Sequence, residues 1–225
     1  MLDDELTGRL SIGCYDAMSP SLLPQLLAEL SRRYPELHVD PVSATQDELV
    51  AALTDGRVEL ALLFDIDLPA NLHLDVVYQS NPHALLPVAH ALAAKASISL
   101  RDLVAEPLIV LTTPPAPKML ERVLQSAELS LTPRYELGNF DLIRAMVHRG
   151  LGYSLFAPPV GHSPAHWNDQ VKAVPIREKL RTAPVVVARV AGVRLTRRAQ
   201  VFRDLCLTNR ASISGANSPE DVAQP

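Results

Sequence analysis

The stretch Val-Glu-Leu-Ala-Leu-Leu-Phe at residues 58–64 decides the fold of this 225-residue chain. Only Glu59 interrupts its apolar residues. An almost continuously apolar strand is typical of the centre of a parallel sheet, where helices cover both faces. Because such a sheet needs helices packed on it, the stretch predicts an α/β architecture.

Two strand-then-helix units precede this central strand. Residues 9–14 alternate in polarity like a strand, and a helix then begins with Ser19 as its N-cap and Pro20 as its first helical residue. The second unit has a strand at 37–42 and a helix that opens with the capping box Thr-Gln-Asp-Glu at 45–48. In both units a helix connects one strand to the next, as the crossover connections of a parallel sheet require.

A second series of the same units follows a break at residues 80–82, Ser-Asn-Pro, which predicts a crossing into another lobe. A strand at 108–111 leads through Thr-Thr-Pro-Pro at 112–115 into a helix with one apolar face. A strand at 135–137 is followed by Asn139 as the N-cap of the next helix. The repeated order predicts a second α/β lobe.

The chain is therefore predicted to form two Rossmann-like lobes joined by two crossover connections. A segment rich in Pro, Gly, His and Ser at 158–169 marks the return crossing. We expect lobe one to comprise residues 8–82 and 166–210, and lobe two to comprise residues 83–165. The polar tail at 211–225 is expected to be disordered.

Four helix starts follow strands, at Ser19, Thr45, Thr113 and Asn139, two in each lobe. In open α/β sheets, ligands bind outside the carboxyl ends of the strands, where helix N-termini present free N–H groups. Donors, hydroxyls and helix dipoles there favour an anion, so we expect a small polar or anionic ligand in a cleft between the lobes. The alternative is that each residue only caps its own helix.

The charge balance argues against direct nucleic-acid binding by this chain. It has 21 basic and 25 acidic residues and a net charge of -4, which gives no basic surface for phosphates. The composition is 48% hydrophobic, enough to bury a substantial core. We therefore expect a folded domain that does not itself bind DNA.

Neither a cofactor nor a metal is expected. Cys14 and Cys206 form no CxxC pair, which argues against a zinc site or a disulfide framework and favours a reducing cytoplasm. His162 and His166 have i,i+4 spacing, but they fall in the Pro- and Gly-rich connection, so we interpret them as surface-loop residues. The acidic N-terminus lacks the features of a signal peptide, and no apolar run is long enough to span a membrane.

Several segments match one bacterial family in order and spacing. They are Gly-Arg-Leu-Ser-Ile-Gly at 8–13, Leu-Leu-Pro-Gln-Leu-Leu-Ala-Glu-Leu at 22–30, Tyr-Pro-Glu-Leu at 34–37, Leu-Thr-Asp-Gly-Arg-Val-Glu-Leu-Ala at 53–61, Leu-Leu-Pro at 85–87, Ile-Ser-Leu-Arg-Asp-Leu at 98–103 and Val-His-Arg-Gly-Leu-Gly-Tyr-Ser-Leu at 147–155. Each motif alone is weak, but together they cover residues 8 to about 205. The chain resembles the effector-binding domain of LysR-type transcription regulators.

The resemblance implies a periplasmic-binding-protein type II fold and a homodimer or tetramer. It also implies that the family's N-terminal winged helix-turn-helix is absent from the chain, with residues 1–7 as the remnant of its linker helix. Carried over by position, the family's ligand pocket falls on Asp16, Ala17, Met18, Ser19, Thr45, Gln46, Phe64, Asp65, Thr113, Pro114, Pro115, Asn139 and Phe140.

The chain departs from the family at Ala17, where many relatives carry a hydroxyl that holds the effector's carboxylate. Asp16 adds a negative charge beside it, so an amine-bearing or polar ligand is an alternative to a plain carboxylate. Phe64 lies at the end of a strand and Phe140 at the start of a helix. Both the pocket and the core remain open for these two aromatic residues.

Two other function classes share the implied fold. An enzyme is not expected, because the sequence has no G-x-S-x-G, G-x-G-x-x-G or Walker A motif. A solute-binding receptor of a transport system would have the same cleft. The family pattern favours the regulator over that receptor.

Overall fold

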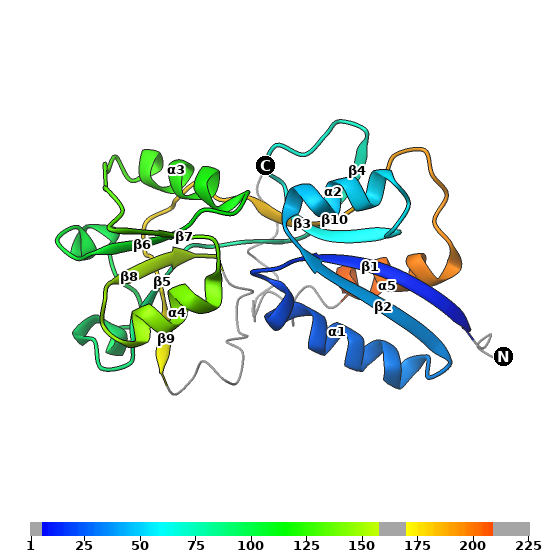
Figure 1. Ribbon diagram of the computed structural model, residues 1–225, viewed down its shortest axis with the longest axis horizontal. Coiled ribbons are helices and arrows are strands. Elements are labelled where there is room, and N and C mark those ends of the chain that lie inside the picture. The colour runs from blue at the N-terminus through cyan, green and yellow to red at the C-terminus, as the bar shows by residue number, and fades with distance from the viewer. Residues whose placement is uncertain (1–5, 158–169, 209–225) are drawn as a thin grey trace. The chain divides into compact units, whose positions relative to one another are not determined.

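The computed structural model describes residues 6–157 and 170–208, and the chain divides into two compact units. Unit 1 comprises Met1–Gln79 and Pro184–Pro225, and unit 2 comprises Ser80–Ala183. Each unit is built on its own five-stranded sheet (Figure 1). The expectations for residues 1–5, for His162 and His166, and for the tail at 211–225 lie outside the described residues.

The sheet of unit 1 is mixed rather than parallel. Its order is β2 (Leu37–Ala44), β1 (Gly8–Tyr15), β3 (Leu60–Phe64), β10 (Pro184–Val190) and β4 (Leu72–Gln79). β1 is parallel to β2 and β3, whereas β10 is antiparallel to β3 and β4. Every residue of β3 is buried, so the prediction of a central strand is confirmed. The expectation of a parallel sheet holds for β1, β2 and β3 but not for β10, which runs antiparallel to both of its neighbours.

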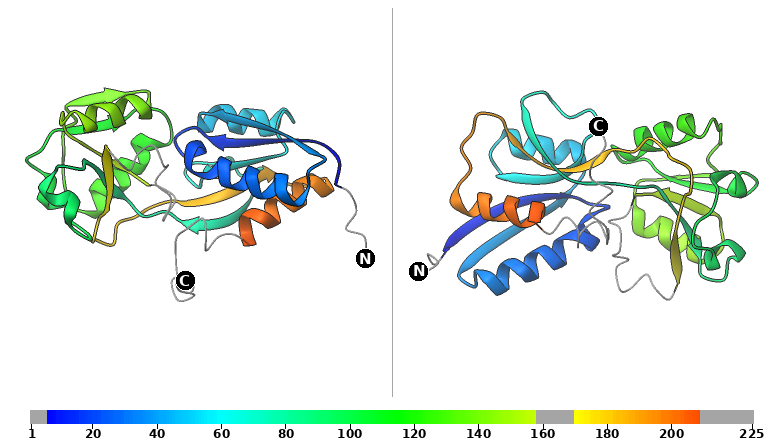
Figure 2. Two further views of the ribbon diagram at one scale, coloured as in Figure 1. Left: turned by 90° about the horizontal axis from the view of Figure 1, so that it is seen from below. Right: turned by 180° about the vertical axis from the view of Figure 1, so that it is seen from behind.

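Three helices cover the two faces of this sheet. α1 (Ser19–Arg33) and α5 (Arg197–Thr208) lie on one face and α2 (Gln46–Thr54) lies on the other (Figure 2). Leu22, Leu26 and Leu30 are buried on α1 at the spacing of one helical face. α2 packs very close to β1, since a Cβ added at Gly13 would lie 2.7 Å from the side chain of Leu49.

The sheet of unit 2 has the same plan. Its order is β7 (Tyr135–Leu137), β6 (Leu108–Leu111), β8 (Tyr153–Phe156), β5 (His83–Pro87) and β9 (Val171–Pro175). β6 is parallel to β7 and β8, whereas β5 is antiparallel to β8 and β9. Two α-helices and two 3-10 helices are described in this unit: α3 (Ala116–Ser126), α4 (Phe140–His148), η1 (Ala91–Ala94) and η2 (Leu100–Leu103).

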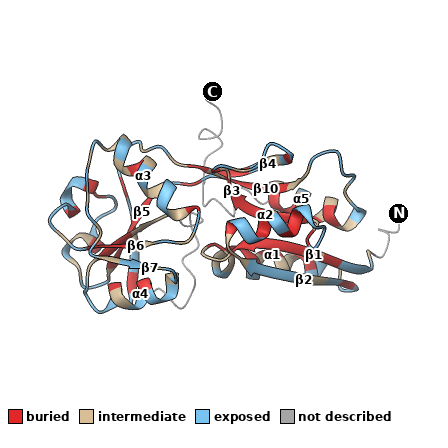
Figure 3. Ribbon diagram, turned by 45° about the horizontal axis from the view of Figure 1, so that its top comes forward, coloured by how far each residue is buried: buried red, intermediate tan, exposed pale blue. Residues whose placement is uncertain are grey.

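The alternation of side chains along β5 divides the core of unit 2 into two layers. Ala84 and Leu86 pack in the layer that contains Val123 of α3. Leu85, which points the other way, packs with Val147 of α4. Buried residues accordingly line the strands and the inward faces of the helices (Figure 3).

The second boundary between the units differs from the expectation. β9 pairs with β5 along its whole length, from Val171↔Pro87 to Pro175↔His83, so it belongs to unit 2. Residues 170–183, expected in lobe one, therefore belong to unit 2. A short apolar strand fits either sheet by its sequence, and only its hydrogen-bonding partner shows which sheet it joins.

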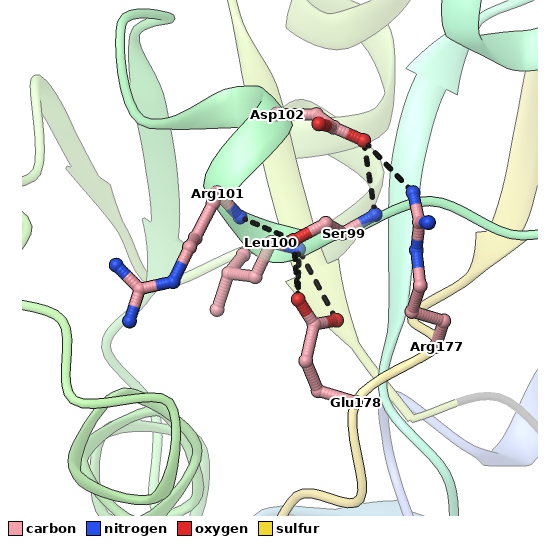
Figure 4. Close-up of polar contacts among 6 residues, drawn as sticks. All are labelled: Ser99, Leu100, Arg101, Asp102, Arg177 and Glu178. Carbon is pink, nitrogen blue, oxygen red and sulfur yellow. Dashed lines mark hydrogen bonds and ion pairs between the residues drawn. The ribbon is translucent and has the colours of Figure 1, made fainter.

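A polar cluster after β9 holds the next residues in unit 2 (Figure 4). The carboxylate of Glu178 accepts a hydrogen bond from the hydroxyl of Ser99 and, at 3.2 and 3.3 Å, from the backbone N–H of Leu100. Arg177 pairs at 3.3 Å with Asp102, whose carboxylate also accepts from the backbone N–H of Ser99 at 3.0 Å. These contacts fix the chain shortly before it returns to unit 1.

The two passages between the units run side by side. The pairing of β4 with β10 reaches Gln79↔Pro184, the residues at which unit 1 is left and re-entered. Directly beyond that pair, the buried hydroxyl of Ser80 donates a 2.7 Å hydrogen bond to the carbonyl oxygen of Ala183. None of the described helices is both long and apolar enough to cross a membrane.

Candidate functional site

The carboxyl ends of β1, β2 and β3 place one group of predicted site residues at a single edge of unit 1. The three strands are parallel, with Tyr15 opposite Ala44 at their ends. The backbone N–H of Asp16 donates to the carbonyl oxygen of Ala44 at 3.0 Å. The N–H of Asp65, which follows β3, donates to the carbonyl oxygen of Pro184 at 2.9 Å.

The start of α1 differs from the prediction that Ser19 is its N-cap. The N-cap is Met18, whose carbonyl oxygen accepts from the N–H groups of Ser21 and Leu22 at 3.0 Å each. The hydroxyl of Ser19 instead donates to the carbonyl oxygen of Asp16 at 3.0 Å. The Ser19 hydroxyl therefore closes the turn that precedes the helix. The local pattern of capping residues does not predict this contact.

Ser43 is a residue of this edge that the sequence analysis missed. Its hydroxyl oxygen lies 2.8 Å from that of Ser19. The two residues are 24 positions apart, and they meet because β1 and β2 pair in parallel register. The available signal was a hydroxyl-bearing residue at the end of a strand, two positions before the Thr45 cap.

The backbone N–H groups at the start of α1 are already bonded within the chain. The N–H of Ala17 donates to Asp16 Oδ1 at 2.6 Å, and the N–H of Met18 donates to the carbonyl oxygen of Tyr15 at 2.9 Å. The N–H of Ser19 donates to the carbonyl oxygen of Asp16 at 3.3 Å, and Pro20 has no N–H. The free donors expected for an anion are therefore occupied at this helix.

Asp16 is a half-buried carboxylate whose pKa lies above its ordinary value. Burial is the largest cause, since it disfavours the charged form. The N–H of Ala17 opposes the shift, whereas the negative charge of Glu48 adds to it. Among the described residues, the neighbouring charge that acts on this carboxylate is thus negative and does not compensate it.

The start of α2 confirms the predicted capping box. Thr45 Oγ1 accepts from the N–H of Glu48 at 3.4 Å, and Glu48 Oε2 accepts from the N–H of Thr45 at 3.0 Å. Gln46 is buried, and its amide bonds to the backbone beyond β3. Its Nε2 donates to the carbonyl oxygen of Ile66 at 2.9 Å, and its Oε1 accepts from the N–H of Phe64 at 3.1 Å. Gln46 therefore fixes the loop that carries Asp65.

The two predicted aromatic residues both have ring neighbours. Phe64 is only 3% exposed, and its ring meets that of Tyr15 edge to face at 5.9 Å. The Phe140 ring lies 5.5 Å from that of Phe156, which also neighbours the ring of His83 at 6.5 Å. Burial lowers the pKa of His83, against the opposing effect of its contact with the carbonyl oxygen of Asn81. Phe64 is a core residue, whereas Phe140 is partly buried.

Unit 2 gathers the other predicted residues where β6 and β7 end. The N–H of Thr112 donates to the carbonyl oxygen of Leu137 at 2.9 Å. The next residue, Gly138, is so close that a Cβ there would lie 3.8 Å from Thr112 Oγ1 and 4.0 Å from Thr113 Cγ2. Thr112 and Gly138 therefore join the predicted residues Thr113 and Asn139 at this edge.

Thr113 does not cap α3, contrary to the prediction. The N-cap is Pro115, after a cis peptide bond between Pro114 and Pro115, and the carbonyl oxygen of Thr113 accepts from the N–H of Ala116 at 3.0 Å. The buried Thr113 Oγ1 has no hydrogen-bond partner among the residues described.

Asn139 is the N-cap of α4, as predicted. Its Oδ1 accepts from the N–H of Leu142 at 2.9 Å. The residue is exposed.

Metal and thiol chemistry find no support in these edges. Within residues 6–157 and 170–208, no three His, Cys, Asp or Glu side chains gather as metal ligands would. Cys14 and Cys206 are free and fully buried, and burial raises the pKa of both thiols, which keeps them protonated and unreactive. The two edges instead offer hydroxyl, amide, carboxylate and backbone groups, which suit reversible binding of a small polar molecule.

Comparison with known proteins gives a consistent result. The sequence pattern described as LysR substrate binding domain matches residues 3–211. The HTH-type transcriptional regulator BbuR of Bordetella bronchiseptica is 30% identical over 164 residues, which make up 67% of this chain and 46% of that protein. The chain spans about half the length of several curated relatives that it matches.

Solved structures share the fold. HinK, a LysR family transcriptional regulator from Pseudomonas aeruginosa, has a TM-score of 0.82 and 31% identity, over 94% of this chain and 72% of that one. The effector binding domain of QuiR, solved in complex with shikimate, has a TM-score of 0.76 over 92% of this chain and 99% of that one. Its identity is 13%, so the likeness concerns the fold alone.

Proposed function

This chain belongs to the LysR substrate-binding domain family, and from that membership we propose that it senses a small polar metabolite for a transcription regulator. The observation that carries the proposal is the family match, which runs from residue 3 to residue 211. The curated relatives are named as transcriptional regulators and not as enzymes. Within the family fold, QuiR was solved with a small polar ligand, shikimate.

Each unit has one edge that carries proposed effector contacts. In unit 1 the proposed contacts are Asp16, Ser19 and Ser43, whose hydroxyl oxygen lies 2.8 Å from that of Ser19. In unit 2 they are Thr113 and Asn139. The unsatisfied Thr113 Oγ1 supports this assignment, because a buried hydroxyl without a partner has hydrogen-bonding capacity left for a ligand.

The remaining parts of the proposal concern the whole regulator. DNA would be bound by a winged helix-turn-helix of the regulator, and the regulator would act in the cytoplasm as a homodimer or tetramer. The net charge of -4 supports the assignment of DNA binding to another part of the protein.

A thermal-shift screen tests the sensing function. The chain is heated with small carboxylates, sugar acids, amino acids and amines. A true effector should raise the free energy of unfolding by about 2.7 kcal/mol when its concentration is about a hundred times its dissociation constant. The same screen on Thr113→Ala and Asn139→Ala should lose the shift, whereas the exposed Thr54→Ala should keep it. A shift that all three variants keep would move the ligand away from the proposed edges, and silence throughout the screen would contradict the sensing function.

A further inference from the structure

The hydrogen-bonding groups around Asp16 determine what kind of ligand this edge can hold. A carboxylate needs donors, yet the N–H groups of residues 16–19 are all used within the chain, at 2.6 to 3.3 Å. The donor nearest to the carboxylate, the N–H of Ala17, is taken by Asp16 itself. The chain's own carboxylate thus occupies the anion position at the start of α1.

The hydroxyl groups of Ser19 and Ser43 can still accept hydrogen bonds, but their protons are already donated within the chain. Ser19 donates its single hydroxyl proton to the carbonyl oxygen of Asp16. The 2.8 Å contact between the two serines must then have Ser43 as its donor, which uses the proton of Ser43 as well. Both oxygens are left as acceptors, so they favour a ligand that donates hydrogen bonds.

No described residue supplies a counter-ion for the charge at this position. Asp16 Oδ2 accepts no hydrogen bond from any described residue, and no described Lys, Arg or His nitrogen lies within 4.0 Å of the carboxylate. The neighbouring charge that acts on it is Glu48, which is also negative. A half-buried carboxylate that lacks a cation is costly, and a ligand cation would offset that cost.

We propose that Asp16 binds a protonated amino group of the effector, with the hydroxyl oxygens of Ser19 and Ser43 as its neutral acceptors. The inference rests on the proposed sensing function and adds the ligand class: amines and amino acids rather than simple carboxylic acids. An ammonium group has three donors and no acceptor, which matches one carboxylate oxygen and two hydroxyl oxygens.

Calorimetric titration of the chain with matched pairs of probes tests the ligand class. The probes that carry an ammonium group are the proteinogenic amino acids and short diamines such as putrescine, and each is paired with the same skeleton without its amino group, such as glutarate for glutamate. At least one amine should bind, and its deaminated partner should bind about 30-fold more weakly or worse, as expected for loss of one member of a desolvated charge pair.

The variant Asp16→Asn supplies the residue-level test. Asparagine keeps an oxygen for the N–H of Ala17 but has no charge, so amine affinity should fall about 30-fold or more. Asp47→Asn removes one charge from the exposed side of α2 and should change affinity less than about twofold. Should Asp16→Asn fail to fold, the unaltered chain gives a second readout, because amine affinity must weaken as the pH falls through the pKa of Asp16.

The possible outcomes separate the two proposals. If deaminated probes bind as tightly as amines and Asp16→Asn binds both normally, the ammonium site is wrong while the sensing function stands. If no probe of either kind binds, the sensing function is contradicted and the ammonium site with it.

Discussion

Ser80 and Ala183 join the two passages of the chain through one hydrogen bond, in which the Ser80 hydroxyl donates to the Ala183 carbonyl oxygen at 2.7 Å. The residues are 103 positions apart, and the side chain of Ser80 is fully buried. A buried carbonyl oxygen that loses its donor cannot turn to water for a replacement. The contact therefore stabilises the place where the chain leaves unit 1 and returns to it.

The variant Ser80→Ala should lower the free energy of unfolding by about 1 to 3 kcal/mol, because it leaves a buried acceptor unsatisfied. Urea denaturation followed by circular dichroism measures the change. Ser97→Ala, at an exposed serine, should stay within about 0.5 kcal/mol of the unaltered chain. Equal effects of the two substitutions would show that the contact adds nothing to stability.

Gly152 is predicted to be intolerant of any side chain. A Cβ there would lie 2.1 Å from the carbonyl oxygen of Pro107, and the residue has a φ of 148°. Gly152→Ala should therefore cost about 3 kcal/mol or more, from the clash and from the backbone strain together. Gly56→Ala is the matched control, since Gly56 has a φ of 70° but nothing within 4 Å. It should cost only about 1 to 2 kcal/mol, and a similar loss in both variants would rule out the clash.

The cap of α4 predicts a graded response at Asn139. Asn139→Ala should lower the unfolding free energy by about 1 kcal/mol, because the N–H of Leu142 loses its acceptor, whereas Asn139→Gly should cost only a few tenths. Thermal denaturation without ligand measures both. A larger loss for glycine than for alanine would mean that the residue acts through something other than the cap.

The raised pKa of Asp16 predicts how stability depends on pH. The unfolded chain releases the proton near the ordinary value of about 3.9, whereas the folded chain holds it to higher pH. In that window the folded state binds more protons, so this residue's contribution lowers the unfolding free energy as the pH rises. The variant Asp16→Asn has no ionisable group at this position and therefore lacks this pH-dependent loss of stability.

The variant should therefore exceed the unaltered chain in stability near neutral pH, and the difference should shrink as the pH falls below the folded pKa. The difference in unfolding free energy is measured from denaturation curves of the two proteins at a series of pH values between 3 and 8. Asp47→Asn is measured alongside as the control. A difference that does not vary with pH would contradict the assigned pKa.

Local patterns predicted the elements well where the evidence lay within a few residues. The apolar run of β3 identified a buried central strand, and the caps at Thr45 and Asn139 followed from contacts to residues three positions further on. At Ser19 and Thr113 the same logic failed. In both places a turn with a nearby proline moves the cap to another residue, Met18 or Pro115.

Features that depend on distant pairing could not be predicted from local patterns. The first half of β4 has no continuous apolar run, because His73 and Asp75 alternate with apolar residues on this edge strand. The sheet that β9 joins is decided by its pairing with β5. The contact between Ser19 and Ser43 depends on the register of β1 and β2.

The pairing of Gln79 with Pro184 makes unit 2 an insertion between two neighbouring strands of a sheet that is otherwise complete. A two-residue hairpin turn is enough to join cross-strand partners of this kind. Replacing Ser80–Ala183 by such a turn leaves every strand of the first sheet in its register. In evolution, the same arrangement lets a gene exchange or diversify the inserted segment while the host sheet keeps its own hydrogen-bond ladder.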